Sequence, residues 1–152
     1  MPNGARTIRL EIGSAVEMLD LVQRVSDHVG QTAGLDEDGV HWFGVAVREC
    51  VTNAIMHGNR DPSRAVSIEF ATTPAAAPSE VRVCVRDQGQ GFDPNQLPDP
   101  LAPENILRTS GRGIFLMRQL MDDVAIERTR DGGMEVRMIK RIGPGQPEAN
   151  VR

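Results

Sequence analysis

Glu49 and Asn53 lie four residues apart in a segment with helical hydrophobic spacing, so both side chains are expected on one face of a helix. The carboxamide oxygen of Asn53 is a hard ligand that suits magnesium, which also takes water and phosphate oxygens. The carboxylate of Glu49 can orient or deprotonate a hydroxyl group or a water. One helix thus offers a metal ligand and a base, whereas the plainer interpretation is an exposed helix face without function.

Asp87 follows an alternating strand pattern and is followed by Gly89 and Gly91. Glycines let the backbone approach a ligand closely, and an aspartate at a strand end can accept a hydrogen bond from an exocyclic amine such as that of adenine. Such a bond contributes about 1.5–3 kcal/mol, enough to discriminate against a base with a carbonyl at that position. The plainer interpretation is a glycine-rich turn. A calcium loop fits less well, because the required run of oxygen ligands is missing.

A third segment, Ser110 to Gly113, precedes another helical pattern. The free N–H groups and the positive end of a helix can receive phosphate oxygens there, and Arg108 and Arg112 add positive charge. Gly111 and Gly113 are the only further indication of a phosphate site, and a lone Gly-x-Gly is weak evidence for one. The plainer interpretation is that Ser110 and the glycines simply cap the helix. The segment lacks the ending of a Walker loop and the position of a dinucleotide fingerprint, which excludes two common nucleotide folds.

The elements that must position these segments follow from hydrophobic periodicity. Strands are expected at 7–12, 65–70, 81–86, 124–128 and 134–139, and helices at 14–30, 36–58 and 113–121. The last two strands flank a turn at 131–133 and form a hairpin. This order predicts an α/β two-layer sandwich, with helices on one face of a mixed, mainly antiparallel sheet. A doubly wound parallel sheet is disfavoured.

Composition sets the broad class of the protein. The 152 residues suffice for one domain, expected over 1–143, with a flexible tail at 144–152. Hydrophobic residues make up 39% and charged residues 25%, and a net charge of -4 argues against nucleic acid or anionic membrane as a partner. No apolar run approaches a membrane span and no signal core is visible, so a cytoplasmic location is expected. Cys50 and Cys84 are expected to be reduced and in or near the core.

The three segments occur in an order, separated by a strand pair and then a proline-rich loop, that resembles the GHKL, or Bergerat-fold, ATPases. The compact size and the stretches 53–58 and 113–122 look like the bacterial anti-sigma-factor serine/threonine kinases of partner-switching systems. The resemblance implies ATP and magnesium as cofactors. It also implies Glu49 as the base, Asn53 as the magnesium ligand and Asp87 as the adenine anchor.

The resemblance further implies that glycines on both sides of the loop contact the nucleotide. Gly89 and Gly91 would shape the nucleotide loop, and Gly111 and Gly113 would face the phosphates. Residues 93–109 would form the ATP lid, with Arg108 as its phosphate-binding arginine. Arg112 departs from the family pattern, in which an uncharged residue is common between the two glycines. Ser110 and Arg112 are nevertheless counted among the expected phosphate contacts, Arg112 because of its positive charge.

The resemblance also implies partners. Such kinases phosphorylate a small anti-anti-sigma protein with a STAS domain, bind a sigma factor in the alternative state, and commonly form homodimers. The expected function is therefore that of an ATP-dependent serine/threonine kinase and anti-sigma factor. The alternatives are a binding module that uses ATP only to sequester a partner, and a remnant of the fold without function. A complete histidine kinase is not expected, since neither His28 nor His41 has the following pattern of a phosphoacceptor.

Overall fold

The computed structural model describes residues 4–58, 63–89 and 109–143. In chain order the elements are β1 (Arg6–Gly13), α1 (Leu19–Ala33), α2 (Glu37–Asn53), β2 (Ala65–Thr73), β3 (Glu80–Arg86), α3 (Thr109–Leu120), β4 (Asp123–Arg128) and β5 (Met134–Arg141). A short 3-10 turn, Val16–Met18, leads into α1, and a π-helical turn, Ala54–Gly58, continues α2.

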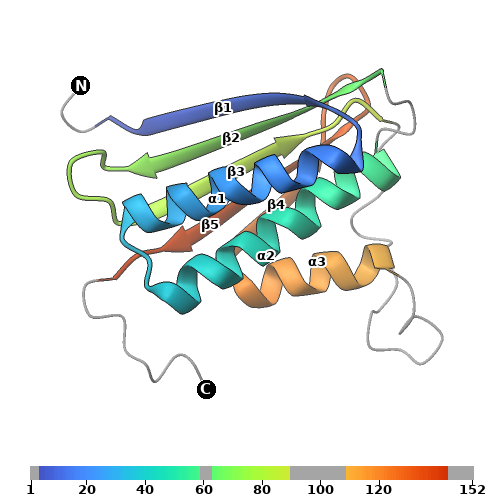
Figure 1. Cartoon of the computed structure of the whole chain (residues 1–152). Coiled ribbons are helices and arrows are strands. Elements are labelled where there is room, and N and C mark those ends of the chain that lie inside the picture. Colours follow the sequence, from blue (N-terminus) through green and yellow to red (C-terminus); the bar gives the residue numbers. More distant parts are fainter. Residues whose placement is uncertain (1–3, 59–62, 90–108, 144–152) are drawn as a thin grey trace.

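The five strands form one sheet in the order β1-β2-β3-β5-β4, and every neighbouring pair is antiparallel. The three helices cover one face of this sheet (Figure 1). The expected two-layer α/β sandwich is confirmed. Among the described strands the sheet is wholly antiparallel rather than mixed.

The core lies between the sheet and the helices. Alternate residues of β3, namely Val81, Val83 and Val85, are buried on the helix-covered face, as strand alternation requires. Helix α2 contributes Phe43, whose ring lies 6.4 Å from that of Phe70 on β2 in a tilted arrangement. This packing fixes the position of α2 over the middle of the sheet.

The first helix differs from the expected range 14–30 at both ends. Its α-helical part begins at Leu19, after the 3-10 turn. The predicted end of the first helix at Gly30 is wrong, because α1 continues to Ala33 and ends at Gly34, whose φ is 102°. Gly30 is buried inside the helix, where a Cβ atom would lie 3.4 Å from the side chains of Leu35 and Val40. Gly30 therefore allows close approach of the α1–α2 connection, and Gly34 supplies the left-handed residue that ends the helix.

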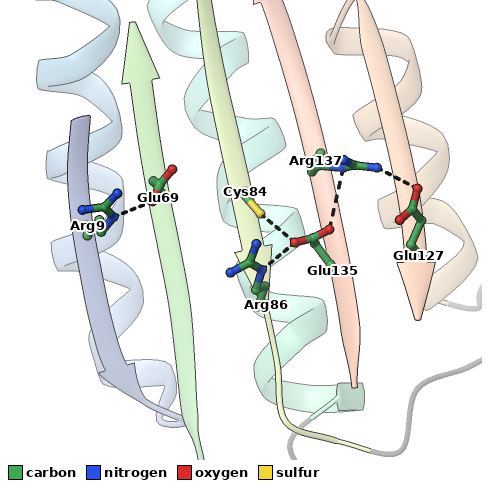
Figure 2. A network of polar contacts seen from close by, with 7 residues as sticks. All are labelled: Arg9, Glu69, Cys84, Arg86, Glu127, Glu135 and Arg137. Atoms are coloured by element: carbon green, nitrogen blue, oxygen red, sulfur yellow. Dashed lines mark hydrogen bonds and ion pairs between the residues drawn. The ribbon is translucent and has the colours of Figure 1, made fainter. Parts of the chain in front are cut away.

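The other face of the sheet carries charged side chains that pair across the strands (Figure 2). Glu135 lies at the centre of this network, 2.5 Å from Arg86 and 3.7 Å from Arg137, and its Oε1 accepts a hydrogen bond of 3.5 Å from the Cys84 thiol. Burial alone would raise the pKa of Glu135, but the hydrogen bond and charge of Arg86, with smaller contributions from Cys84 and Arg137, hold that pKa below its usual value. The face is therefore polar and internally paired.

Cys84 is expected to react slowly with alkylating reagents. Its burial, followed by the charge of Glu135, raises the pKa of the thiol to about 11, so the reactive thiolate is scarce at pH 8. Iodoacetamide should modify Cys84 roughly 100-fold more slowly than a free thiol, as followed by mass spectrometry. Glu135→Gln should accelerate the reaction by removing the negative charge. A wild-type rate equal to that of a free thiol would contradict this assignment.

Candidate functional site

The three segments of interest meet at one end of the molecule, on the helix-covered side of the sheet. Asp87 continues the buried alternation of β3, so it faces the layer in which α2 lies. The C-terminal ends of α2 and β3 and the start of α3 lie at the same end of the fold (Figure 1). The carboxylate at the strand end and α2 are thus on the same side of the sheet.

Glu49 and Asn53 converge on the first turns of α3. A Cβ atom placed on Gly113 would lie 2.9 Å from Nδ2 and 3.3 Å from Oδ1 of Asn53, and 3.2 Å from Oε2 of Glu49. Both polar side chains are half-buried, whereas Gly113 is fully buried. The absence of a side chain at Gly113 therefore leaves the space into which the carboxylate and the carboxamide project.

The third segment lies inside a helix rather than before one. The expected helix start at Gly113 is wrong, because α3 begins at Thr109 and the residues 110–113 form its first turns. Packing of Gly113 against α2 overrides the low helix propensity of glycine in this segment. The backbone N–H groups of the first turn of α3 have no intrahelical partner, so they remain suited to an anion such as phosphate.

The polar face of α2 ends in an irregular turn. Directly after Asn53 the helix widens into the π-helical turn Ala54–Gly58. Such turns are rare and frequent at functional sites, because they change the direction in which neighbouring side chains project. Ala54 and Ile55 of this turn remain buried in the core, so the widening occurs at a fixed position rather than at a frayed end.

The Asp87 side chain is buried and held by backbone groups. Its Oδ1 accepts hydrogen bonds from the N–H of Gly89 at 2.9 Å and from the N–H of Met134 at 3.1 Å. The neighbouring Gln88 binds the start of β2, where its Oε1 accepts a 3.2 Å hydrogen bond from the N–H of Ala65. The turn after β3 is therefore attached to strands on both sides. Sequence reasoning missed Met134, because the only sign of it is a hairpin turn far along the chain.

Cys50 provides a second indication that Asp87 lies close to α2. Its thiol is buried beside Glu49 on the core side of the helix, as the helical spacing predicts. Burial, followed by the charges of Cys84 and Asp87, raises the pKa of this thiol well above its usual value. The charge of Asp87 thus reaches the helix that carries Glu49 and Asn53. Cys50 and Cys84 are both free thiols.

Several predicted site residues lie outside what the structure describes. Gly91, Arg108 and the lid as far as residue 108 are outside the described residues, as is the tail 144–152. Ser110, Gly111 and Arg112 lie in the first turns of α3, but their side chains are not among those described. The described part of the site therefore consists of the residues on α2, those at the end of β3, and Gly113.

The donor set on α2 suits magnesium in the presence of phosphate. Oδ1 of Asn53 and Oε2 of Glu49 lie near the same point beside Gly113, and both are the hard oxygens that magnesium prefers. Within residues 4–58, 63–89 and 109–143, no group of three or more His, Cys, Asp or Glu side chains is arranged to hold a metal on its own. A magnesium ion here would therefore share its coordination with water and phosphate oxygens, which is its usual arrangement.

Gly113→Ala is expected to separate stability from nucleotide binding. The new Cβ must displace the Asn53 carboxamide, and small misplacements at such sites can cost up to about 100-fold in activity. Alanine in a helix is favoured over glycine by about 0.8–1.0 kcal/mol, so the melting temperature should hold or rise while ATP binding with magnesium weakens. Calorimetry and thermal unfolding measure the two effects. Gly13→Ala, whose Cβ would meet nothing within 4 Å, is the control, and unchanged ATP binding in Gly113→Ala would contradict the placement of Asn53.

Among the described helices, none has the length and apolar character needed to cross a membrane.

Comparisons with known proteins agree with this fold. A Histidine kinase-like ATPase domain model matches residues 12–140. The Serine-protein kinase RsbW of Staphylococcus epidermidis is 30% identical over 149 residues, covering 94% of this chain and 91% of the relative. The same-named protein of Staphylococcus aureus strain MRSA252 is 27% identical over 151 residues, with the same coverage of both chains.

A solved structure shares the fold at lower sequence identity. The crystal structure of the RsbU and RsbW domains of Rv1364c from Mycobacterium tuberculosis superposes with a TM-score of 0.61 at 17% identity. The match covers 90% of this chain and 32% of that longer chain. With the family model spanning residues 12–140 and a relative of 30% identity spanning nearly the whole length, the chain belongs to the histidine kinase-like ATPase family.

Proposed function

We propose that this protein is an ATP-dependent serine/threonine protein kinase and anti-sigma factor of a bacterial partner-switching system. The observation that carries the proposal is the convergence of Glu49 and Asn53 beside Gly113, at the end of the fold where Asp87 faces the same helix layer. A kinase of this size requires a catalytic base, a metal ligand and a carboxylate that recognises adenine. The relatives named Serine-protein kinase RsbW support the same activity.

In the proposed complex each group has one task. Asp87 accepts a hydrogen bond from the exocyclic amine of adenine, and Asn53 would hold magnesium. The first-turn N–H groups of α3, with Gly111 and Gly113, receive phosphate oxygens. Ser110, Arg108 and Arg112 add further phosphate contacts, and Gly89 and Gly91 allow the loop after β3 to approach the nucleotide. Magnesium, when bound, neutralises charge that develops on the phosphates.

The reaction is the transfer of the γ-phosphoryl group to a hydroxyl group of the partner. The hydroxyl oxygen forms a bond to the γ-phosphorus, the bond between that phosphorus and the bridging oxygen breaks, and ADP leaves. The hydroxyl proton passes to the carboxylate of Glu49, which is half-buried beside Gly113 and so lies where the phosphates are expected. Glu49 is therefore the proposed catalytic base.

The partners follow from the family resemblance. We expect a small anti-anti-sigma protein with a STAS domain as the phosphorylated partner, a sigma factor bound in the alternative state, and a homodimer in the cytoplasm. The net charge of -4 favours protein partners over nucleic acid. The open face of the sheet carries paired charges. The proposed nucleotide site lies on the helix-covered side, so ATP binding does not depend on a partner at the open face.

Incubation with ATP, magnesium and a STAS-domain protein from the same organism tests the proposal. Mass spectrometry should find phosphate on a serine or threonine of that protein, with one ADP released for each phosphate. A stable complex with bound ATP but no phosphate on any candidate partner would favour the alternative, a binding module that uses ATP to sequester its partner. Absence of ATP binding at millimolar concentrations would overturn both proposals.

A further inference from the structure

We infer that Gly133, at the end of the turn between β4 and β5, and the backbone N–H of Met134 belong to the nucleotide site as the groups that position the Asp87 carboxylate. The inference rests on the proposed function, because it takes Asp87 as the group that recognises adenine. It adds two residues that lie 46 and 47 positions after Asp87 in the chain and that carry no reactive side chain. Their effect is expected on the choice of base rather than on phosphoryl transfer.

Three hydrogen bonds attach Asp87 to its neighbours. The N–H of Asp87 donates to the carbonyl oxygen of Met134 at 3.0 Å, and the N–H of Met134 donates back to Oδ1 at 3.1 Å. The N–H of Gly89 donates to the same Oδ1 at 2.9 Å. Among the described residues neither side-chain bond falls on Oδ2. The two hydrogen bonds that Oδ1 accepts thus fix the orientation of the carboxylate. Oδ2 is left as the oxygen that can bind a ligand.

Gly133 permits this arrangement because it has no side chain. A Cβ atom at Gly133 would lie 2.2 Å from the carbonyl oxygen of Asp87, 3.0 Å from its carbonyl carbon and 3.1 Å from its Oδ1. Real Cβ atoms essentially never approach another atom as closely as 2.2 Å, and the other two contacts are tight. The first two involve backbone, which cannot rotate away as a side chain can. Its φ does not demand glycine, since the positive φ of this turn, 93°, belongs to Gly132. Close approach to Asp87 is therefore the reason for glycine at position 133.

The turn that presents Gly133 is itself fixed. The N–H of Thr129 donates to the carbonyl oxygen of Gly133 at 2.8 Å, and the N–H of Gly132 donates to the carbonyl oxygen of Thr129 at 3.0 Å. On the opposite face of the sheet, Arg86 and Glu135 pair at 2.5 Å, one position along from Asp87 and Met134 on the same two strands (Figure 2). The distance between Gly133 and Asp87 is therefore set by hydrogen bonds within the turn and by an ion pair on the open face of the sheet.

The matched pair Gly133→Ala and Gly132→Ala tests the inference. Alanine at either position perturbs the turn, but only at 133 does the new Cβ meet Asp87, whereas at 132 it meets nothing within 4 Å and is strained only by the positive φ. The probes are ATP and inosine triphosphate, which carries a carbonyl oxygen in place of the exocyclic amine, and the readout is the ratio of their dissociation constants by calorimetry. Wild type should prefer ATP by about 10- to 150-fold.

Gly133→Ala should reduce this preference by about tenfold or more, because the displaced carboxylate no longer meets the amine. Gly132→Ala should keep the preference of wild type even if its melting temperature falls. An unchanged ratio in Gly133→Ala beside a selective wild type would overturn the inference alone. A wild type that binds both nucleotides equally well would overturn it together with the role of Asp87 in the proposed function.

A second measurement does not require Gly133→Ala to fold. In Asp87→Asn, which keeps the shape of the side chain, the amide proton resonances of Met134 and Gly89 should both move, since their acceptor changes from a carboxylate to a neutral carbonyl. The amide of Gly132, which donates to Thr129 instead, serves as the reference. Shifts of Met134 and Gly89 no larger than that of Gly132 would overturn the inference.

Discussion

Replacing Glu49 with glutamine is expected to lower phosphoryl transfer by about 10²- to 10⁴-fold, the usual contribution of a positioned general base. Glutamine keeps the volume and polarity of the side chain but cannot take up the hydroxyl proton. The affinity for ATP should stay nearly the same, because Asn53, Asp87 and the start of α3 are unaltered. Transfer to a STAS-domain partner, followed by mass spectrometry, and ATP binding, followed by calorimetry, measure the two quantities separately.

Glu37→Gln is the matched control for this experiment. Glu37 is an exposed glutamate in the first turn of the same helix, so its replacement changes the same charge far from the nucleotide end. It should cost only a few tenths of a kcal/mol of stability through the helix dipole and leave transfer unchanged. Equal transfer rates in wild type and Glu49→Gln would show that Glu49 is not the base, and the partner hydroxyl would then need another acceptor.

The fold follows closely from hydrophobic periodicity, because the alternation of each strand and the stripe of each helix agree with one another. All five strands occur where the alternation predicts them, with ends that either coincide with the prediction or extend by one to three residues. Two of the helix boundaries that differ, at Gly30 and before Gly113, have the same cause. Glycine favours a helix end when only local preference counts, but each of these glycines is buried against another helix segment, and packing decides there.

The candidate site is predicted only as far as its side chains have recognisable chemistry. The side chains of Glu49, Asn53 and Asp87 indicate a catalytic base, a metal ligand and an adenine-binding group, respectively. Helical spacing places the first two on one face of the helix. Gly133 and Met134 act through backbone atoms, so their types carry no such signal, and a pair of glycines in a hairpin is fully explained by turn formation. The positive φ of Gly132 and the short distance between a Cβ at Gly133 and Asp87 separate the roles of the two glycines.

Asp87→Asn is expected to weaken ATP binding by about 1.5–3 kcal/mol, or roughly 10- to 150-fold. The carboxamide oxygen can keep the two N–H bonds that Oδ1 now accepts, from Met134 and Gly89. That orientation directs the amide nitrogen, a donor, toward the position of Oδ2. A donor there faces the exocyclic amine of adenine and cannot pair with it, whereas it can pair with the carbonyl oxygen of inosine triphosphate. The nucleotide preference should therefore shift toward inosine triphosphate.

Calorimetry with both nucleotides measures this shift, and Asp131→Asn is the control, since it makes the same replacement at an exposed position in the β4–β5 turn. Weaker binding of ATP together with equally weaker binding of inosine triphosphate would contradict recognition of the amine by Asp87. A large fall of the melting temperature without nucleotide would assign Asp87 a structural role instead.

Asp87→Ala distinguishes the structural and the recognition roles of this carboxylate in a single comparison. Alanine leaves the N–H groups of Met134 and Gly89 without the acceptor that they share, and each buried donor left unpaired costs about 1–3 kcal/mol. The alanine variant should therefore lose stability as well as ATP binding, whereas the asparagine variant should lose ATP binding alone. Equal losses of stability in the two variants would mean that the charge of Asp87, rather than its hydrogen bonds to the backbone, holds this end of the sheet together.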